Sequence, residues 1–376
     1  MKGSRNIRRG LAAAAALLLA AGGVALAGHG SDSTKVAAKR PAPASTTLST
    51  EAPTTSSSVD PTTTAPPTTG APATHSSGTS APRSSAPRTT SAPRTTAPPA
   101  PPPPTSGYTA AFYYGWYPSS FSNPGTKYHP SDGQYSSNDP AEVKHQIDEM
   151  RYAGMQGGIF SWWGAASAPG QPYGYQQVDR AFGVALQAAH GTPFQWAIYF
   201  ESGAPVFGDR SVGALQGYMQ YIKDHYAGDP NYMHMGGRPV LFVWPNAGDG
   251  CGMATNWATA NAAEGFYIVQ KRFDGYQSCQ GLADSWHEYS PNVYSSVLKP
   301  YSYSVSPGFD RYDSGGPHLA RNPGAFDQAV AAMAAAPVQW KLVTTFNEWG
   351  EGTAVEPAAE WGNTYLDILH NHLGSR

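Results

Sequence analysis

Short apolar runs alternate with amphipathic helical patterns over residues 108–376, and this alternation constrains the fold most strongly. The runs are almost continuously hydrophobic, as in strands buried on both faces of a parallel sheet that helices cover. Eight strands are therefore predicted, at residues 110–117, 157–164, 194–200, 239–244, 265–270, 286–288, 301–306 and 339–346.

Helices are predicted between most of these strands. The clearest has Asp139 as its N-cap and Pro140 at its first helical position. The others are expected near residues 175–190, 212–226, 256–263, 291–298, 323–335 and 358–373, while the helix after the fifth strand is nearly missing. This count favours an α/β fold with a single closed (β/α)8 TIM barrel. An open doubly wound sheet is the alternative, although no glycine-rich phosphate loop supports it.

The first 107 residues lack this pattern. Residues 1–27 combine four basic side chains with an Ala/Leu-rich run that ends in Ala25-Leu-Ala27, which is typical of a secretory signal peptide. An uncleaved N-terminal anchor is the alternative. Residues 28–107 are mostly Ser, Thr, Pro and Ala, so a disordered linker is expected. The protein is therefore predicted to be secreted or held at the cell surface, with the barrel at residues 108–376.

Charge is unevenly distributed between these parts. Of the 24 Lys/Arg and 26 Asp/Glu residues, ten basic and three acidic ones lie in residues 1–106, which leaves a net charge of about −9 on the rest. An acidic, aromatic-rich domain is a poor partner for nucleic acid or anionic lipid. An oligo- or polysaccharide suits it better, because Trp and Tyr faces stack on sugar C–H groups and carboxylates accept hydrogen bonds from hydroxyls.

The histidines and cysteines show no metal-ligand spacing, so neither a metal nor another cofactor is predicted, and the protein is expected to be a monomer. Cys251 and Cys279 are the only cysteines. In an exported protein they are expected to form a disulfide, worth about 3 kcal/mol in the chain-entropy model. The bridge would join the loops that follow the fourth and fifth predicted strands.

Three carboxylates, Glu348, Glu351 and Glu356, follow the last predicted strand beside Trp349. Carboxylates this close together and next to an aromatic ring repel one another and are partly desolvated, so at least one should keep its proton to unusually high pH. A glycosidase needs such a group as an acid, with a second carboxylate as base or nucleophile. An acidic surface loop is the alternative.

Aromatic and charged residues also stand at the ends of the other predicted strands, where a barrel places its active site. A purely structural role is the alternative for each of them. The tryptophans can pack in the core, and the arginine can neutralise nearby acids. We predict that substrate is bound by Tyr113, Trp116, Trp162, Trp163, Glu201, Trp244, His287 and Arg311.

A set of motifs occurs in a fixed order along the chain: Tyr113-Tyr-Gly-Trp116, Ser137-Asn-Asp-Pro140, Gly157-Gly-Ile-Phe-Ser-Trp-Trp163, Tyr199-Phe-Glu201, Gly237-Arg-Pro-Val240, Ser306-Pro-Gly308 and Phe346-Asn-Glu-Trp-Gly-Glu-Gly352. This set resembles glycoside hydrolase family 99, the endo-α-mannosidase and endo-α-1,2-mannanase family, and its family 99-like relatives. The resemblance covers residues 111–370. It implies a (β/α)8 barrel that cleaves inside α-mannosyl chains with retention and without metal.

The resemblance also implies roles for single residues. Glu351 matches the general acid/base that protonates the leaving oxygen, and Glu348 matches the base that deprotonates the sugar's own 2-hydroxyl, so that a 1,2-anhydro sugar forms. Glu201 matches a carboxylate that binds sugar hydroxyls. Two departures concern specificity. Gly350 stands where better-known members usually have histidine, and residues 310–321 replace a basic, tryptophan-containing segment.

The sequence thus predicts a secreted, retaining, endo-acting α-mannoside hydrolase. A barrel that binds cell-surface glycan without cleaving it is one alternative, and a hydrolase of the same fold acting on another polysaccharide is a second. The Glu348/Glu351 pair favours catalysis, because a pure binder gains little from placing two like charges together.

Overall fold

The computed structural model describes residues 107–168, 173–203, 207–246 and 248–374, and the structural statements below concern these residues. The predicted signal peptide, and the predicted linker up to residue 106, lie outside the described residues. None of the described helices has the length and apolar character needed to cross a membrane.

Eight parallel strands of the described residues build the core of the fold. Six of them lie side by side in chain order: β1 (Tyr108–Tyr114), β2 (Gly157–Trp162), β3 (Gln195–Glu201), β5 (Arg238–Trp244), β6 (Tyr267–Lys271) and β7 (Ser285–His287). On the other side of β1, the sheet continues with β10 (Trp340–Val343) and β9 (Ser302–Val305), and Tyr108 of β1 pairs with Trp340. Between β7 and β9, the Glu288 amide donates to Ser302 Oγ (3.2 Å). The nearly closed barrel confirms the predicted fold class.

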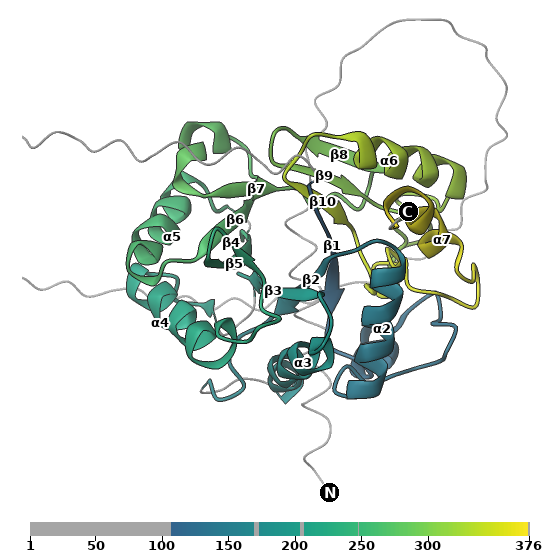
Figure 1. Cartoon of the computed structure of the whole chain (residues 1–376), viewed down its shortest axis with the longest axis horizontal. Helices are drawn as coiled ribbons and strands as arrows, with labels where there is room; N and C mark the ends of the chain where they lie inside the picture. Colours follow the sequence, from purple (N-terminus) through teal and green to yellow (C-terminus); the bar gives the residue numbers. More distant parts are fainter. Residues whose placement is uncertain (1–106, 169–172, 204–206, 247, 375–376) are drawn as a thin grey trace, which may run out of the picture. The chain divides into compact units, whose positions relative to one another are not determined.

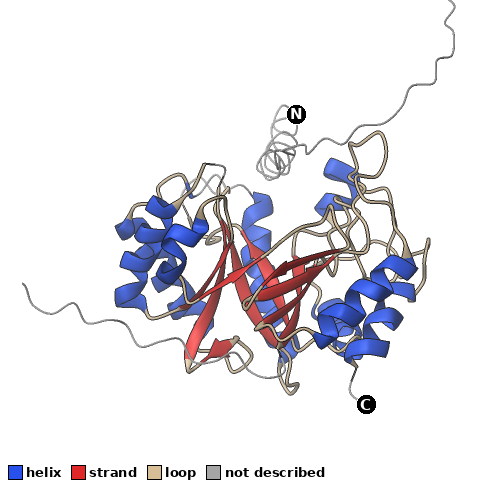
Figure 2. Ribbon diagram, turned by 90° about the horizontal axis from the view of Figure 1, so that it is seen from above, coloured by secondary structure: helices blue, strands red, loops and turns tan. Residues whose placement is uncertain are grey.

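Helices surround these strands (Figures 1 and 2). The Asp139 carboxylate caps the first of them by accepting a hydrogen bond from Ala141 N (2.9 Å), and Pro140 begins it, as predicted. Short helical turns cover Phe121–Gly125, Lys223–Ala227 and Tyr276–Leu282. The last of these follows the fifth barrel strand, where the sequence predicts hardly any helix. The helices are α2 (Pro140–Tyr152), α3 (Tyr173–Ala189), α4 (Val212–Ile222), α5 (Cys251–Glu264), α6 (Pro323–Ala335) and α7 (Thr364–Leu373).

The helix predicted near residues 291–298 is wrong. Its second half is a strand, β8 (Ser295–Leu298), which runs antiparallel to β9 with Val297 opposite Tyr303. Only eight residues separate Pro291 from Pro300, too few for a turn followed by a stable helix, whereas a hairpin satisfies the backbone groups over that length. A second hairpin joins β4 (His234–Met235) to β5.

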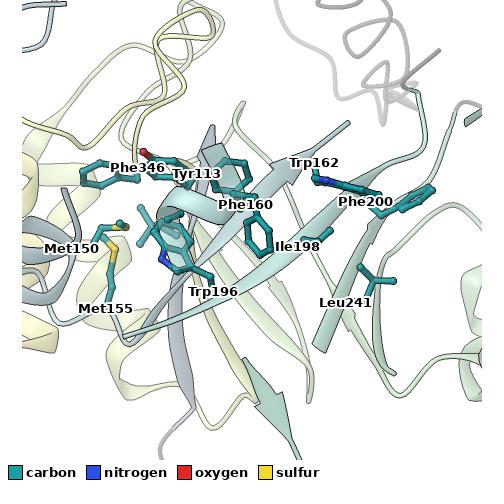
Figure 3. Packing of buried hydrophobic residues seen from close by; sticks show 14 of the residues in the cluster. Tyr113, Met150, Met155, Phe160, Trp162, Trp196, Ile198, Phe200, Leu241 and Phe346 are labelled. Carbon is teal, nitrogen blue, oxygen red and sulfur yellow. The ribbon is translucent and has the colours of Figure 1, made fainter. Parts of the chain in front are cut away.

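Side chains alternate between two packing layers along each strand. Facing the helices, Tyr113 and Phe160 pack around Trp196 and reach toward Phe346 and Met150 (Figure 3). Inside the barrel, the His287 ring centroid lies 5.4–5.6 Å from those of Phe112, Tyr199 and Phe242, and the Phe112 and Tyr199 rings lie 5.0 Å apart. The two layers decide which strand-end residues can reach the barrel mouth.

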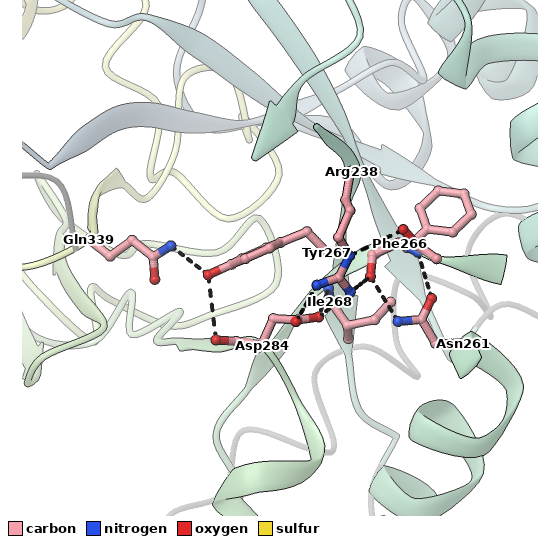
Figure 4. A network of polar contacts seen from close by, with 8 residues as sticks. Arg238, Asn261, Phe266, Tyr267, Ile268, Asp284 and Gln339 are labelled. Atoms are coloured by element: carbon pink, nitrogen blue, oxygen red, sulfur yellow. Dashed lines mark hydrogen bonds and ion pairs between the residues drawn. The ribbon is translucent and has the colours of Figure 1, made fainter. Parts of the chain in front are cut away.

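A polar network ties the strands together at their amino-terminal ends (Figure 4). The Asp284 carboxylate pairs with both terminal nitrogens of Arg238 (2.6 and 2.9 Å) and accepts from Ile268 N (2.9 Å). The amide of Gln339, the residue before β10, donates to Tyr267 Oη (2.7 Å) at the start of β6. Arg238 of the Gly-Arg-Pro motif is therefore a structural residue of this end.

Candidate active site

The segment after β10 folds back on itself and presents Glu348 at the carboxyl-terminal ends of the strands. The Glu348 amide donates to Thr345 Oγ1 (2.8 Å), and the Thr353 amide donates to the Glu348 carbonyl (3.2 Å). Asn347 clamps the end of β1, because its side chain accepts from Tyr114 N (2.8 Å) and donates to Tyr114 O (3.0 Å). Glu348 is thus held directly beside β1.

Glu356 supports this segment from behind. Its carboxylate is buried and accepts from Gln146 Nε2 (2.7 Å), Tyr135 Oη (2.8 Å) and Trp349 Nε1 (2.8 Å). Burial raises its pKa well above the usual range, and the charge of Glu149 adds to the shift. All three of these donors belong to the scaffold, so Glu356 holds Trp349 in place and does not face the mouth.

Glu348 and Glu351 lie close enough to influence each other's ionisation. Glu348 is buried, and its Oε2 has no partner among the described residues. Burial raises the pKa of Glu348 well above its usual range, and the neighbouring Glu351 raises it further. Burial also raises the pKa of Glu351, while the Tyr289 hydroxyl and the charge of Arg311 oppose this. Both shifts favour a proton held on the pair over two charged carboxylates.

Two tyrosines support Glu351. Tyr289 Oη donates to Glu351 Oε2 (2.7 Å), and Tyr114 Oη donates to Tyr289 Oη (3.0 Å). Burial raises the pKa of both tyrosines well above the usual range, so they remain hydrogen-bond donors at any physiological pH. The chain of hydroxyls fixes the orientation of the Glu351 carboxylate.

Glu201, the last residue of β3, is a third carboxylate of this group. Ser161 Oγ donates to its Oε1 (3.0 Å) and accepts in turn from Trp163 Nε1 (2.9 Å). Its Oε2 has no partner in the described part of the chain. Burial raises the pKa of Glu201 to about 8, despite the Ser161 hydrogen bond, and the Glu351 charge contributes.

Aromatic rings flank the carboxylates. The Trp116 ring lies 4.8 Å from that of Tyr114 and 5.8 Å from that of Trp163. On the β5 side, Trp244 meets the Tyr289 ring edge-on at 5.5 Å, and the Lys271 ammonium lies 4.9 Å above the Trp244 ring. Trp116, Trp163 and Trp244 thus belong to the group that the sequence predicts.

Two further predicted residues lie at its margin. His287 is buried one layer deeper, between Phe112 and Tyr199, and burial lowers its pKa to about 3, so it is neutral. Arg311 forms a two-pronged ion pair with Asp313 (2.9 and 2.7 Å), and its charge still acts on Glu351. Both His287 ring nitrogens lack a hydrogen-bond partner among the described residues, and the side-chain hydrogen bonds of Arg311 go to Asp313.

Tyr113 and Trp162 do not reach the mouth, so the prediction is wrong for these two residues. Tyr113 Oη donates to Gln146 Oε1 (2.6 Å) on α2, and Trp162 Nε1 donates to Asp179 (2.7 Å) on α3. Figure 3 shows Tyr113 beside Phe346 and Phe160, and Trp162 beside Phe200, within the cluster of buried residues. The two-residue period of a strand explains this, because their neighbours Tyr114 and Ser161 face the barrel interior instead.

The sequence interpretation missed Tyr289 and Ser161. The same period could have found them, since Tyr289 lies two residues after His287 and Ser161 two residues before Trp163. Away from the carboxylates, the structure joins Cys251 at the start of α5 to Cys279 in a disulfide, the pairing that the sequence predicts. Within the described ranges, no group of three or more His, Cys, Asp or Glu side chains is arranged to hold a metal.

The fold and this group together define a parallel α/β barrel with carboxylates and aromatic rings at the carboxyl-terminal ends of its strands, the place where barrels of this class bind and transform ligands. Comparison with family models and with curated protein sequences finds no match.

Solved structures do match this chain. The chain is similar to the GH99 endo-alpha-mannosidase from Bacteroides thetaiotaomicron, with a TM-score of 0.55 and 19% identity over 71% of this chain and 96% of that one. The complex of that enzyme with BIS-TRIS-Propane gives a TM-score of 0.55 at 20% identity, over 71% of this chain and 95% of that one. A glycoside hydrolase-like protein gives a TM-score of 0.50 at 14% identity, over 75% of this chain and 98% of that one. The chain therefore shares the GH99 fold, in agreement with the resemblance of its motifs.

Proposed function

We propose that this protein is a glycoside hydrolase that cleaves α-mannosidic linkages inside a glycan chain. The observation that carries the proposal is the pair Glu348 and Glu351, in which one carboxyl is buried with an oxygen left unpartnered among the described residues and the other is held by Tyr289. An acid and a base with separate environments are what glycosidic cleavage requires. The shared GH99 fold supports the same choice of reaction class.

The unpartnered oxygen of Glu348 suggests how the proton is distributed when substrate binds. Without substrate, burial favours the protonated form of Glu348. A sugar hydroxyl that donates to Glu348 Oε2 would favour its charged form, which leaves the proton of the pair on Glu351. Binding would thus convert Glu348 into a base and Glu351 into an acid.

In the proposed first step, Glu348 takes the proton of the sugar's 2-hydroxyl and O2 attacks C1. The bond from C1 to the leaving oxygen breaks, and that oxygen receives the proton of Glu351, which gives a 1,2-anhydro sugar. In the second step, Glu351 takes a proton from water, the water oxygen attacks C1, and O2 recovers its proton from Glu348. Two inversions at C1 give net retention.

Aromatic rings and a third carboxylate near the pair are suited to bind the substrate. Trp116, Trp163, Trp244 and Glu201 would bind the sugars on either side of the cleaved bond, through ring stacking and hydrogen bonds. We propose an exported monomer, secreted or held at the cell surface, that needs no metal or other cofactor.

The test is digestion of an α-1,2-linked mannan with the full chain. We expect oligosaccharides from internal cleavage, and a loss of at least about a thousandfold in kcat for Glu348→Gln and for Glu351→Gln. Asp148→Asn, at an exposed acid on α2, is the control and should keep wild-type rates. Wild-type rates in both carboxylate variants would refute the assignment. Mannan binding without release of product from any glycan tested would instead favour a binding barrel.

A further inference from the structure

The loop after β9, residues 309–314, lies along the catalytic segment, and we call it the strap loop. The Asp310 amide donates to the Glu351 carbonyl (2.9 Å), and the Tyr312 amide donates to the Gly350 carbonyl (2.9 Å). Two backbone hydrogen bonds therefore fix the strap loop to the residues that follow Glu348.

Asp310 anchors the strap loop to a different part of the barrel. Its carboxylate accepts from Lys127 Nζ (2.6 Å), Tyr128 Oη (3.1 Å) and Ser314 Oγ (3.1 Å). Partial burial alone would raise the pKa of Asp310, but these donors hold it below its usual value. The carboxylate stays charged, so the anchor persists over the pH range in which a glycosidase works.

Gly350 leaves open a space that Glu348 and Tyr312 share. A Cβ atom added at Gly350 would lie only 2.9 Å from Glu348 Oε1, and 4.0 Å from Cδ1 of Tyr312. The Tyr312 ring thus borders the space beside the Glu348 carboxyl. Tyr312 is half-buried, and its hydroxyl has no hydrogen-bond partner in the described part of the chain.

We infer that Tyr312 is a specificity-determining residue, whose ring forms the wall of the subsite next to Glu348 and stacks on the C–H face of the sugar bound there. A pyranose offers an apolar face for the ring and hydroxyls for the free phenol group. Asp310 acts as a positioning residue, since it holds the loop that carries Tyr312. The inference rests on the proposed function.

The test measures KM and kcat on α-1,2-mannan, and Kd for an α-1,2-mannan oligosaccharide, with variants of the full chain. Tyr312→Ala should raise KM and Kd about tenfold and leave kcat within about threefold, because stacking contributes to binding in both ground and transition states. Tyr312→Phe, which keeps the ring, should recover most of the affinity.

Asp310→Asn should raise KM in the same direction, while Asp310→Glu should recover part of it. Tyr152→Ala, at an exposed tyrosine of α2, is the matched control and should behave as wild type. The inference is overturned if Tyr312→Ala binds the oligosaccharide as tightly as the wild type, whatever the rates. An absence of cleavage by the wild type would overturn only the proposed function, because the Kd comparison does not depend on turnover.

Discussion

At the amino-terminal end of the barrel, the Asp284 carboxylate is paired with Arg238 and accepts a backbone hydrogen bond. At the carboxyl-terminal end, Glu201 and Glu348 are more deeply buried, yet each has one oxygen without a partner among the described residues. The carboxylate thus has its hydrogen-bond partners at the amino-terminal end of the barrel, whereas carboxylates at the carboxyl-terminal end lack some of theirs.

We interpret the amino-terminal end as serving stability and the carboxyl-terminal end as serving function. A buried acceptor without a donor costs about 1–3 kcal/mol, so folding alone gives no reason to keep two of them together. A ligand rich in hydroxyl groups can supply the missing donors. We therefore assign the carboxyl-terminal end of the barrel to the substrate. Variants at the two ends should therefore affect different properties.

The largest effect is expected at Glu348. Glu348→Gln should lower kcat on α-mannan at least about a thousandfold, yet leave the thermal midpoint unchanged, because the neutral amide replaces a carboxyl whose protonated form burial already favours. Thermal unfolding followed by circular dichroism, beside a digestion assay on the same sample, measures both. A large drop in the midpoint would mean that Glu348 is a structural residue.

At the opposite end, Asp284→Asn should lower the free energy of unfolding by about 2 kcal/mol, since the amide loses the ion pair with Arg238, which solvent partly screens. The kcat/KM of the folded protein should not change. Urea unfolding with kinetics below the transition tests this. Reduced kcat/KM at full folding would break the separation of the two ends.

A smaller effect is expected for Tyr289→Phe, which removes the hydrogen bond to Glu351 Oε2. That bond lowers the pKa of Glu351, so its loss should raise this pKa and move the alkaline limb of the pH–rate profile to higher pH. We expect about a tenfold loss of kcat. An unshifted alkaline limb would show that Tyr289 does not act through Glu351.

The last comparison concerns the pH dependence of stability, where the expected change is in a slope and not in activity. Glu201 has a folded-state pKa of about 8, whereas an unfolded glutamate titrates near 4.3, so the folded chain binds the extra proton between these values. Stability should therefore fall as pH rises from about 4 through about 8. In Glu201→Gln the fall of the thermal midpoint should be shallower. Parallel curves for the two proteins would contradict the raised pKa.

Much of the fold follows from local pattern, whereas the site depends on which way each strand faces. The apolar runs and the Asp139-Pro140 start of α2 predict most elements within a few residues. The β8 hairpin was missed, because residues 291–298 have no periodicity strong enough to decide between helix and strand. Tyr113 and Tyr114 are identical in type, and only the register of β1 decides that Tyr114 faces the mouth.

The pairing of β1 with β10 has a consequence for biosynthesis. Asn347 clamps Tyr114 across 233 residues of chain, so the two halves of the site are made far apart in time. At a typical synthesis rate, Tyr114 precedes Asn347 by roughly 10 to 50 seconds. During that interval β1 lacks its second neighbour, and the nascent chain holds no assembled carboxylate pair. The site comes into being only when the last strand is added.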